Sequence, residues 1–502
     1  MGIYVIGIGG TGAKCVESVA QLAGIGLFTE QPIKVLFIDA DETNGNLERA
    51  RNCLTYYQEA YQLISVGDKK EFPWMKTQIE SFNLWSPFAQ QSMNKELKTF
   101  FNYNTIKQNQ PTLGSLFDVL YTKEEREVSL DIGFRGRPAI GSAVMSQVDL
   151  DKLDKEPWGS LIKQIQGDIS SGKKPKVFLC GSIFGGTGAS GLPTIARLID
   201  NKLKRINVRD RLEIGCLFVL PYFGFSPPAG EDPDGIYARS EQFLLNTEAA
   251  LRYYVTQGQE IFDAVYLLGN ENFSQVQFSI GKNSQRNQPH FIELYAGLAA
   301  RHFLLTPPKE KGAVVLISRE HKDKLTWQDI SDTDEVKQKL VNATRFAYVW
   351  LAEIASELTN ARKQGADRFG RLAPWLTRFY RTNNSQTNLP DFSEAKEQDA
   401  IQTINRWCQE YLRWLAAIHQ CEFEQVELFN ADIFSHLDNQ LKSEEQNNLV
   451  IGDNRDRTRK AQDTPKRLKE RLNPNQITPP NQGTVGLAKA VYLELSNLWG
   501  TN

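Results

Sequence analysis

The sequence predicts an α/β protein in which a mostly parallel sheet, with helices on both faces, is followed by a mainly helical half. From Met1 to about Thr306, short β-branched runs alternate with helical stretches, a pattern typical of parallel sheets. Most of these runs lead into a glycine-rich or polar turn before the next helix. After Pro307 the alternation ends and long helical stretches follow. Strands are expected at Ile3–Gly7, Val35–Asp39, Val128–Ile132, Val177–Gly181, Leu212–Leu220 and Ala264–Gly269.

Composition divides the chain into three regions. Residues 1–306 are expected to form the α/β domain, with an aromatic-rich helical insertion at about 46–105. Residues 307–441 contain one clear strand, Ala313–Ile317, and are otherwise helical in pattern. Residues 442–502 are rich in Asn, Gln, Lys, Arg and Pro, which predicts a polar linker before a terminal helix. Helices of the second half are expected at Glu335–Lys363, Leu372–Tyr380, Ala395–His419, Glu422–Leu441 and Leu487–Leu498.

One predicted helix, Ala395–His419, carries a pronounced apolar face. Trp407, Tyr411, Trp414 and Ile418 recur at helical spacing along it. Such a face needs a partner, and we expect it to pack on the first domain. Packing on a second subunit or on another protein is the alternative.

Overall composition argues against several functional classes. The 502 residues are 41% hydrophobic and 24% charged, with a net charge of −2, so no positive field favours nucleic acid or a membrane surface. The longest apolar runs are strand-sized, well short of the roughly 20 residues needed to cross a bilayer. Six scattered cysteines form no CxxC pair, and no His lies at metal-ligand spacing. We therefore expect a cytoplasmic protein without a metal site built from protein ligands alone.

A first glycine-rich loop follows the first predicted strand. Gly7–Gly12 reads GIGGTG, a G-x-G-x-x-G pattern that brings backbone N–H groups and a helix N-terminus against an anion. The next strand ends in two acidic residues, Asp39 and Asp41. Taken alone, these features indicate a dinucleotide-binding unit in which a carboxylate holds a ribose hydroxyl. An NAD-dependent oxidoreductase is therefore one hypothesis.

A second strand–loop–helix unit favours a chain of phosphates instead. Phe184–Gly191 reads FGGTGASG between a strand and a helix. Its glycines would let the backbone approach phosphate oxygens, while two hydroxyls and the start of a helix add further donors. The alternative is that the glycines only permit tight turns. The residues expected to contact phosphate in the two loops are Gly9, Gly10, Thr11, Gly12, Gly185, Gly186, Thr187, Gly188, Ala189 and Ser190.

The second loop resembles the phosphate motif G-G-G-T-G-[ST]-G of the tubulin/FtsZ superfamily. Phe184 replaces the first glycine, Ala189 the hydroxyl residue and Ser190 the last glycine, while the central G-G-T-G is intact. Gly133–Gly141, GFRGRPAIG, resembles the γ-phosphate-sensing loop of FtsZ. Contacts to phosphate there would come from Gly136 and Arg137, and Arg135 could pair with phosphate charge as well. The resemblance covers about Met1–Leu305 and is greatest to divergent bacterial tubulin-like proteins.

This resemblance implies a bound guanine nucleotide, GTP or GDP, with Mg²⁺ held through the phosphates. Leu217–Phe223 resembles the strand and loop near the sugar, and Phe262–Glu271 the strand whose base-reading asparagine maps onto Asn270. In the family, a central helix supplies a second base contact from near its start. Spacing leaves the contact open among Asn287 and Glu293 as readers of the base, and Phe291 and Tyr295 as stacking residues.

Hydrolysis in this family uses carboxylates of an N-x-D-x-x-D loop that act on nucleotide held by the neighbouring subunit. Trp327–Asp332 has both aspartates, Asp329 and Asp332, but a tryptophan replaces the asparagine. The two carboxylates could position an attacking water beside a metal. They could equally cap the helix that begins near Glu335, and we favour the cap.

The sequence thus predicts a GTP-binding, tubulin-like protein whose nucleotide state controls self-association into oligomers or filaments. GTP hydrolysis is expected to be slow or absent, and the helical half is a possible site for a protein partner. Two alternatives stay open: the NAD-dependent oxidoreductase, and a scaffold that binds no nucleotide.

Overall fold

A computed structural model describes most of the chain. The described residues are 2–65, 74–88, 95–150, 156–225, 239–257, 260–276, 285–306, 310–319, 324–382, 388–421, 425–437, 441–452, 463–472 and 481–499. Among them, no helix combines the length and the apolar character that crossing a membrane requires.

A parallel seven-stranded sheet forms the centre of the first half, in the order β3-β2-β1-β4-β5-β7-β9. Its strands are β1 Ile3–Ile8, β2 Ile33–Ile38, β3 Ile79–Ser81, β4 Lys176–Ser182, β5 Glu213–Val219, β7 Ala264–Leu268 and β9 Ala313–Leu316. The chain steps outward from β1 in one direction and from β4 in the other, so the strand order reverses between these two strands. Ligands of open α/β sheets bind at such a reversal, beyond the carboxyl ends of the strands.

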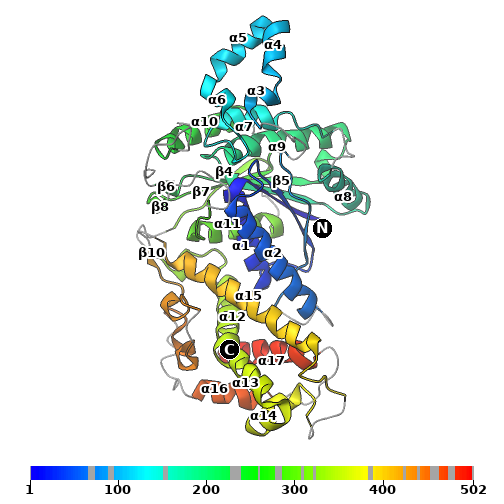
Figure 1. Ribbon diagram of the computed structural model, residues 1–502, viewed down its shortest axis with the longest axis vertical. Helices are drawn as coiled ribbons and strands as arrows, with labels where there is room; N and C mark the ends of the chain where they lie inside the picture. Colours follow the sequence, from blue (N-terminus) through cyan, green and yellow to red (C-terminus); the bar gives the residue numbers. More distant parts are fainter. Residues whose placement is uncertain are drawn as a thin grey trace.

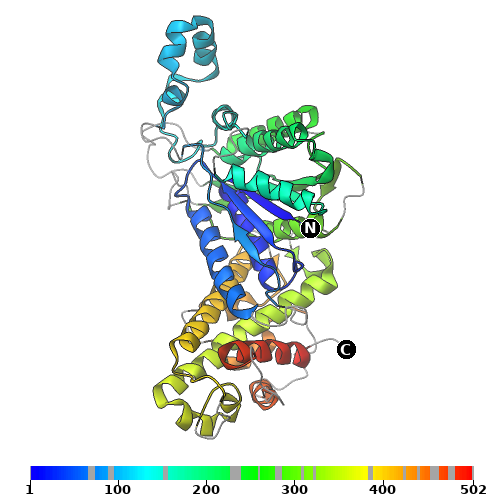
Figure 2. The same ribbon diagram turned by 90° about the vertical axis from the view of Figure 1, so that its right-hand side faces the viewer.

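Helices cover both faces of the sheet, and each face has its own apolar core (Figures 1 and 2). One core involves α1 Gly9–Gly24, α2 Gly45–Ile64 and α11 Phe291–Leu305. The other involves α7 Pro138–Met145, α8 Trp158–Ser170, α9 Thr187–Arg205 and α10 Glu241–Gln257. The predicted α/β class is therefore confirmed. Two short strand pairs lie outside the sheet: β6 Phe223–Phe225 with β8 Ser274–Val276, and β10 Lys324–Leu325 with β11 Gln425–Val426.

The second half is mainly helical, as predicted, and shares the core of the α1 face. Its helices are α12 Thr333–Val349, α13 Ala355–Gln364, α14 Ala366–Leu372, α15 Ala395–His419, α16 Asp463–Arg471 and α17 Gly483–Trp499. The apolar face of α15 packs within the chain: Trp407 lies edge-on to Trp74, with 5.3 Å between ring centroids, and stacks on Tyr411 at 5.4 Å. A Cβ on Gly24 of α1 would lie 3.2 Å from the Trp407 indole nitrogen, so α15 rests directly on α1.

Several predicted elements in the first half differ from the structure. Val128–Ile132 is not a strand: Ser129 makes one isolated bridge to Glu96, and the apolar side chains of Val128 and Leu130 pack into the second core. The short edge strand β3 was not predicted. Within the expected helical insertion at 46–105, α2 instead packs on α1 and β3 joins the sheet. The helices that project from the body are α4 Tyr103–Asn109 and α5 Pro111–Leu120, above the short α3 Leu97–Phe100 and α6 Lys123–Glu127 (Figure 1).

The second half also differs in places from what the sequence predicts. Ala313–Ile317 forms β9, which pairs with β7 and extends the main sheet. The described part of Glu422–Leu441 holds β11 and a short 3-10 helix, Ala431–Ile433, in place of a long helix. The region expected to be a polar linker contains a 3-10 helix, Ser443–Asn448, and α16, while residues 453–462 and 473–480 of it lie outside the described residues.

Replacement of Trp407 by alanine should destabilise the whole chain, because one apolar core spans the sheet and the helical half. Trp407 is 3% exposed, and truncating a buried aromatic side chain costs about 3–5 kcal/mol of unfolding free energy. Urea unfolding should show a single transition that shifts to lower denaturant. The neighbouring Arg406→Ala, which removes a surface pair with Glu59, should change the unfolding free energy by less than about 1 kcal/mol. Two separate transitions would contradict the shared core.

Candidate functional site

A cleft opens where β1, β2 and β4 end, at the reversal of strand order. Eleven residues predicted from the sequence line it: Gly9, Gly10, Thr11, Asp39, Asp41, Gly136, Gly185, Gly186, Thr187, Gly188 and Asn287. They come from five separate segments of the chain. The tertiary fold thus brings the three glycine loops and the acidic pair into one space.

Glycine is required where these loops meet. Gly9, the first residue of α1, has a φ of +73°, and a Cβ there would lie 3.3 Å from the backbone nitrogen of Gly188. A Cβ on Gly186 would lie 3.0 Å from Phe134 Cβ and 3.2 Å from the backbone nitrogen of Gly136. The first and third loops therefore both approach the second more closely than side chains would comfortably allow.

Three of the residues predicted to contact phosphate, Gly12, Ala189 and Ser190, do not line the cleft. A Cβ on Gly12 would lie 2.5 Å from the carbonyl oxygen of Cys180, so this glycine lets α1 approach β4. The Ser190 hydroxyl donates to the carbonyl oxygen of Gly186 at 2.8 Å within α9. Neither residue lines the cleft, and neither does Ala189, in the first turn of α9.

The two arginines of the third loop point to different places. Arg135, with a φ of +46°, lines the cleft. Arg137 does not: it lines a neighbouring groove, where its Nε lies 3.6 Å from a carboxylate oxygen of Glu125. Of the two arginines considered from the sequence, the structure therefore brings Arg135 to the glycine loops.

Asp39 is a buried acid with an unused oxygen. It is 3% exposed, and its Oδ1 accepts from the backbone N–H of Asp41 at 3.1 Å. Its Oδ2 is buried with no hydrogen-bond partner within 3.5 Å among the described residues. Burial raises the pKa of Asp39 to about 7, and the nearby charge of Asp41 adds to the shift. Asp41 itself accepts from the backbone N–H and the hydroxyl of Thr43, at 3.1 and 2.9 Å.

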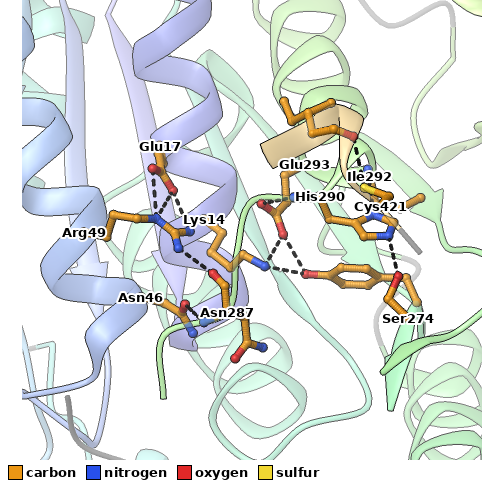
Figure 3. Close-up of polar contacts among 12 residues, drawn as sticks. Lys14, Glu17, Asn46, Arg49, Ser274, Asn287, His290, Ile292, Glu293 and Cys421 are labelled. Atoms are coloured by element: carbon orange, nitrogen blue, oxygen red, sulfur yellow. Dashed lines mark hydrogen bonds and ion pairs between the residues drawn. The ribbon is translucent and has the colours of Figure 1, made fainter. Parts of the chain in front are cut away.

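Amide side chains line the other end of the cleft. Asn44 caps α2 by accepting from the backbone N–H groups of Asn46 and Leu47, and Asn46 Oδ1 accepts from the backbone N–H of Asn287 at 2.8 Å. Arg49 donates to the Asn287 carbonyl. The side-chain amide of Asn287, whose residue is 9% exposed, has no hydrogen bond among the described residues and points away from this network (Figure 3).

Asn44 and Asn46 were not predicted, although a signal existed. An Asn-x-Asn pair follows Asp39-Ala40-Asp41 at the start of a helix, where the first backbone N–H groups need acceptors. The sequence does not show that the same asparagines also reach the segment before α11, because that contact joins residues 241 positions apart.

A buried charge network holds the start of α11. Lys14 of α1 forms an ion pair with Glu293, and the Tyr222 hydroxyl donates to the same Glu293 oxygen at 2.9 Å (Figure 3). The other Glu293 oxygen accepts from the backbone N–H of His290 at 3.0 Å. Glu293 is 1% exposed, and both of its carboxylate oxygens have partners in this network. It is therefore a structural residue and has no oxygen left to contact a nucleotide base.

His290 is the neutral cap of α11. Its Nδ1 accepts from the backbone N–H of Ile292 at 3.2 Å, and its Nε2 lies 3.1 Å from the Ser274 hydroxyl. Burial, with the positive charges of Lys14 and Arg319, lowers the pKa of His290 to about 3. The imidazole is therefore uncharged near neutral pH, as its accepting role at Nδ1 requires.

Asn270 lies outside the glycine cleft. It sits beyond the end of β7, two strands from β4, and lines a separate hollow together with Phe291, Tyr295 and Arg319. Its side-chain nitrogen donates to the Asn272 carbonyl at 2.8 Å, and Arg319 lies 3.4 Å from its Oδ1. The base-reading position expected at Asn270 is thus not brought to the loops, whereas Asn287 is.

Asp329 and Asp332 lie along α11: the Asp329 carbonyl accepts from the Tyr295 hydroxyl at 2.9 Å, and Asp332 is held by Arg301 further along the helix. Asp329 caps the 3-10 helix Trp327–Asp329 by accepting from the backbone N–H and hydroxyl of Thr326, at 2.8 and 2.9 Å. Asp332 precedes α12 and forms an ion pair with Arg301. Both therefore have structural roles, and neither lines the cleft of its own chain.

No protein-family model and no curated protein sequence matches the chain. Among solved structures it is similar to a GTPγS-bound protofilament of CetZ2 from Haloferax volcanii, at 14% identity over 60% of this chain and 59% of that chain, with a TM-score of 0.27. It is also similar to TubZ of Clostridium botulinum phage c-st, truncated at its C-terminal tail, at 16% identity over 59% and 58%, with a TM-score of 0.25. The chain spans about three-fifths of the length of each.

Replacing Asp39 by asparagine should stabilise the nucleotide-free protein more at pH 8 than at pH 5.5. The raised pKa means that the folded state keeps its proton up to about pH 7, whereas the unfolded carboxyl loses it near its ordinary value of 3.8. The contribution of the Asp39 carboxyl to the unfolding free energy is therefore complete below pH 4. It falls by up to about 1.4 kcal/mol per pH unit until pH 7. Urea unfolding should show a gain for Asp39→Asn about 2 kcal/mol larger at pH 8. An equal gain at pH 5.5 and at pH 8 would contradict the raised pKa of Asp39.

Proposed function

We propose that this chain binds a guanine nucleotide in the glycine cleft, with the phosphates against the three glycine loops. The supporting observation is the close meeting of these loops, where a Cβ on Gly9 or Gly186 would lie 3.0–3.3 Å from the neighbouring loop, beside the first turns of α1 and α9. The first N–H groups of a helix have no partner within the helix and carry the positive end of its dipole. Two helix starts facing one cleft suit a ligand with several phosphates.

Asp39 and Asp41 are the residues that would hold a Mg²⁺ ion on those phosphates. Mg²⁺ is usually bound through one or two carboxylates together with substrate phosphates, and these acids stand at the edge of the cleft. The Oδ2 of Asp39 fits this role, because it accepts no hydrogen bond within 3.5 Å among the described residues and a buried carboxylate oxygen is costly to leave without a donor or a cation. The ion would neutralise phosphate charge.

Asn287 is the residue that we propose reads the base. An amide offers a donor and an acceptor together, which can pair with the edge of guanine. Its backbone is held from both sides by Asn46 and Arg49, and its side-chain amide has no hydrogen bond among the described residues. Phe223, Phe225 and Phe243 line the same cleft and offer apolar surface for a ring.

The two alternatives fit the cleft less well. An NAD-dependent oxidoreductase would use Gly7–Gly12 and Asp39 and would need only this one glycine loop. In the structure a second glycine loop lies against the first, at Gly9 and Gly188, and a dinucleotide site does not account for it. A scaffold that binds no nucleotide would bear the cost of the buried Asp39 with no compensating ligand.

Self-association is the second part of the proposal. α11 runs from the segment that carries Asn287 to Arg301, which holds Asp332, so one rigid helix joins the cleft to the acidic loop. The Asp332 side chain is 58% exposed, which leaves the loop accessible to another chain. Head-to-tail stacking would place this loop over the cleft of the next copy, and such contacts build filaments. Because Asp329 and Asp332 are engaged in caps and ion pairs, slow or absent hydrolysis is expected.

The purified protein should retain GTP or GDP, identified by chromatography after denaturation, and GTP should raise its light scattering. Gly186→Val should lower nucleotide retention at least tenfold and abolish the GTP response, because the added side chain would displace the loop at Phe134 and Gly136. Gly167→Val is the matched control: a Cβ there meets nothing within 4 Å. Circular dichroism verifies folding. Retained ATP or NAD would contradict the proposal, and no nucleotide with unchanged assembly in Gly186→Val would favour the scaffold.

Asn287→Ala should weaken GTP binding about 10- to 100-fold, the effect of losing a paired hydrogen-bonding group. Binding is measured by titration with a fluorescent GTP analogue. Asn270→Ala serves as the control and should leave the dissociation constant unchanged, because Asn270 lies in the separate hollow. The opposite pattern would place the base at Asn270 and overturn the assignment.

A further inference from the structure

A helical hairpin, here called the arm, projects from the body of the molecule and consists of α4 and α5, residues 103–120 (Figures 1 and 2). Polar and aromatic contacts hold it together: Lys107 lies 2.9 Å from an Asp118 carboxylate oxygen, and the rings of Tyr103 and Phe117 are 5.4 Å apart. Arg126 of α6 also pairs with Asp118. The only charge on α5 is therefore neutralised within the hairpin.

The rest of α5 exposes large apolar side chains. Leu113, Leu116, Val119 and Leu120 are 45%, 50%, 83% and 58% exposed. Leu113, Leu116 and Leu120 follow the i, i+3, i+7 spacing by which one helix anchors in an apolar groove. A folded hairpin with an uncharged, apolar outer face presents a docking element.

An apolar groove lies at the foot of the arm, between α7, α9 and α10. Most of its lining residues are apolar, among them Leu120, Pro138, Pro193, Leu245, Ala249 and Tyr253, and three are charged, Glu125, Arg137 and Arg197. Leu245 and Tyr253 of α10 are 66% and 37% exposed. Leu120 reaches the groove of its own chain, but Leu113 lies seven residues further along α5, about 10 Å away along the helix axis. Leu113 and Leu116, here called the outer leucines, do not line the groove of their own chain.

The exposed area is sufficient for a specific contact between two copies. At about 175 Å² for each large apolar side chain, the six exposed residues of the arm and groove amount to roughly 600 Å² per chain. That is the upper end of the roughly 300–600 Å² of the largest apolar patch on a typical monomer, and patches of this size are often functional. A reciprocal contact would bury roughly 1,200 Å², the lower end of stable specific interfaces.

We propose that two copies of this chain dock reciprocally, the outer leucines of each arm filling the apolar groove of the other. A second copy is the occupant that the molecule itself supports, because an apolar helix and a matching apolar groove stand on the same chain. The groove and the cleft share only Gly136 among their lining residues, and the groove does not include the acidic loop, so the interface goes beyond the nucleotide-dependent stacking proposed above and does not depend on it.

The test is the oligomeric state of the full-length protein without added nucleotide, measured by light scattering after size exclusion at several concentrations. The wild type should be dimeric in the micromolar range. Leu116→Asp in the arm and Leu245→Asp in the groove should each weaken the dimer at least tenfold. Leu372→Asp, at a residue that is 74% exposed in α14, is the matched control and should remain dimeric.

Mixing the two single variants distinguishes self-docking from other uses of the same surface. A mixture of Leu116→Asp and Leu245→Asp keeps one intact arm opposite one intact groove, so a mixed dimer should form more strongly than either variant dimerises alone. A monomeric wild type, a dimer insensitive to both substitutions, or a failure of the mixture to recover would overturn the proposal. Nucleotide retention should be equal in all four proteins, so loss of the dimer is distinguishable from failure of the nucleotide site.

Discussion

The candidate site depends on the close approach of the three glycine loops, at the edge of the sheet where β1, β2 and β4 end. A side chain at Gly9 or Gly186 would press on the neighbouring loop. The same closeness directs the starts of α1 and α9 into one space and buries Asp39 beside them. Peptide dipoles that favour negative charge, beside a buried acid with one oxygen free of hydrogen bonds among the described residues, are the features on which the proposed site for phosphates and their cation rests.

Helix α11 connects the cleft to the helical half of the chain. The Lys14–Glu293 pair and the Tyr222 hydroxyl fix the start of the helix against α1. A buried ion pair of this kind contributes little net stability, yet losing one partner leaves an uncompensated charge, so its effect is chiefly to hold a unique arrangement. From there α11 leads to Arg301, which pairs with Asp332 and Glu335 at the start of α12. The cleft and the helical half are thus joined by one element.

A second connection links the loops to the face that carries the groove. Asn246 of α10, which lines the groove, donates to the carbonyl oxygens of Phe184 at 3.0 Å and Gly136 at 3.4 Å. Both acceptors belong to the glycine loops. One side chain of the groove therefore contacts the second and the third glycine loop at once.

By itself, the sequence determined the fold class, the central strands, the glycine loops and α15, because buried strands and long amphipathic helices leave a strong periodic signal in neighbouring residues. It also placed Asp39 and Asn287 among the candidates for the cleft. Only the tertiary structure decided that Asn270 and Arg137 face elsewhere, that Asn46 holds Asn287, and that β3 and β9 complete the sheet. Periodicity reports which side of an element is buried. Which loop ends meet depends on strand order and on contacts between residues far apart in the chain, and no local pattern encodes those distances.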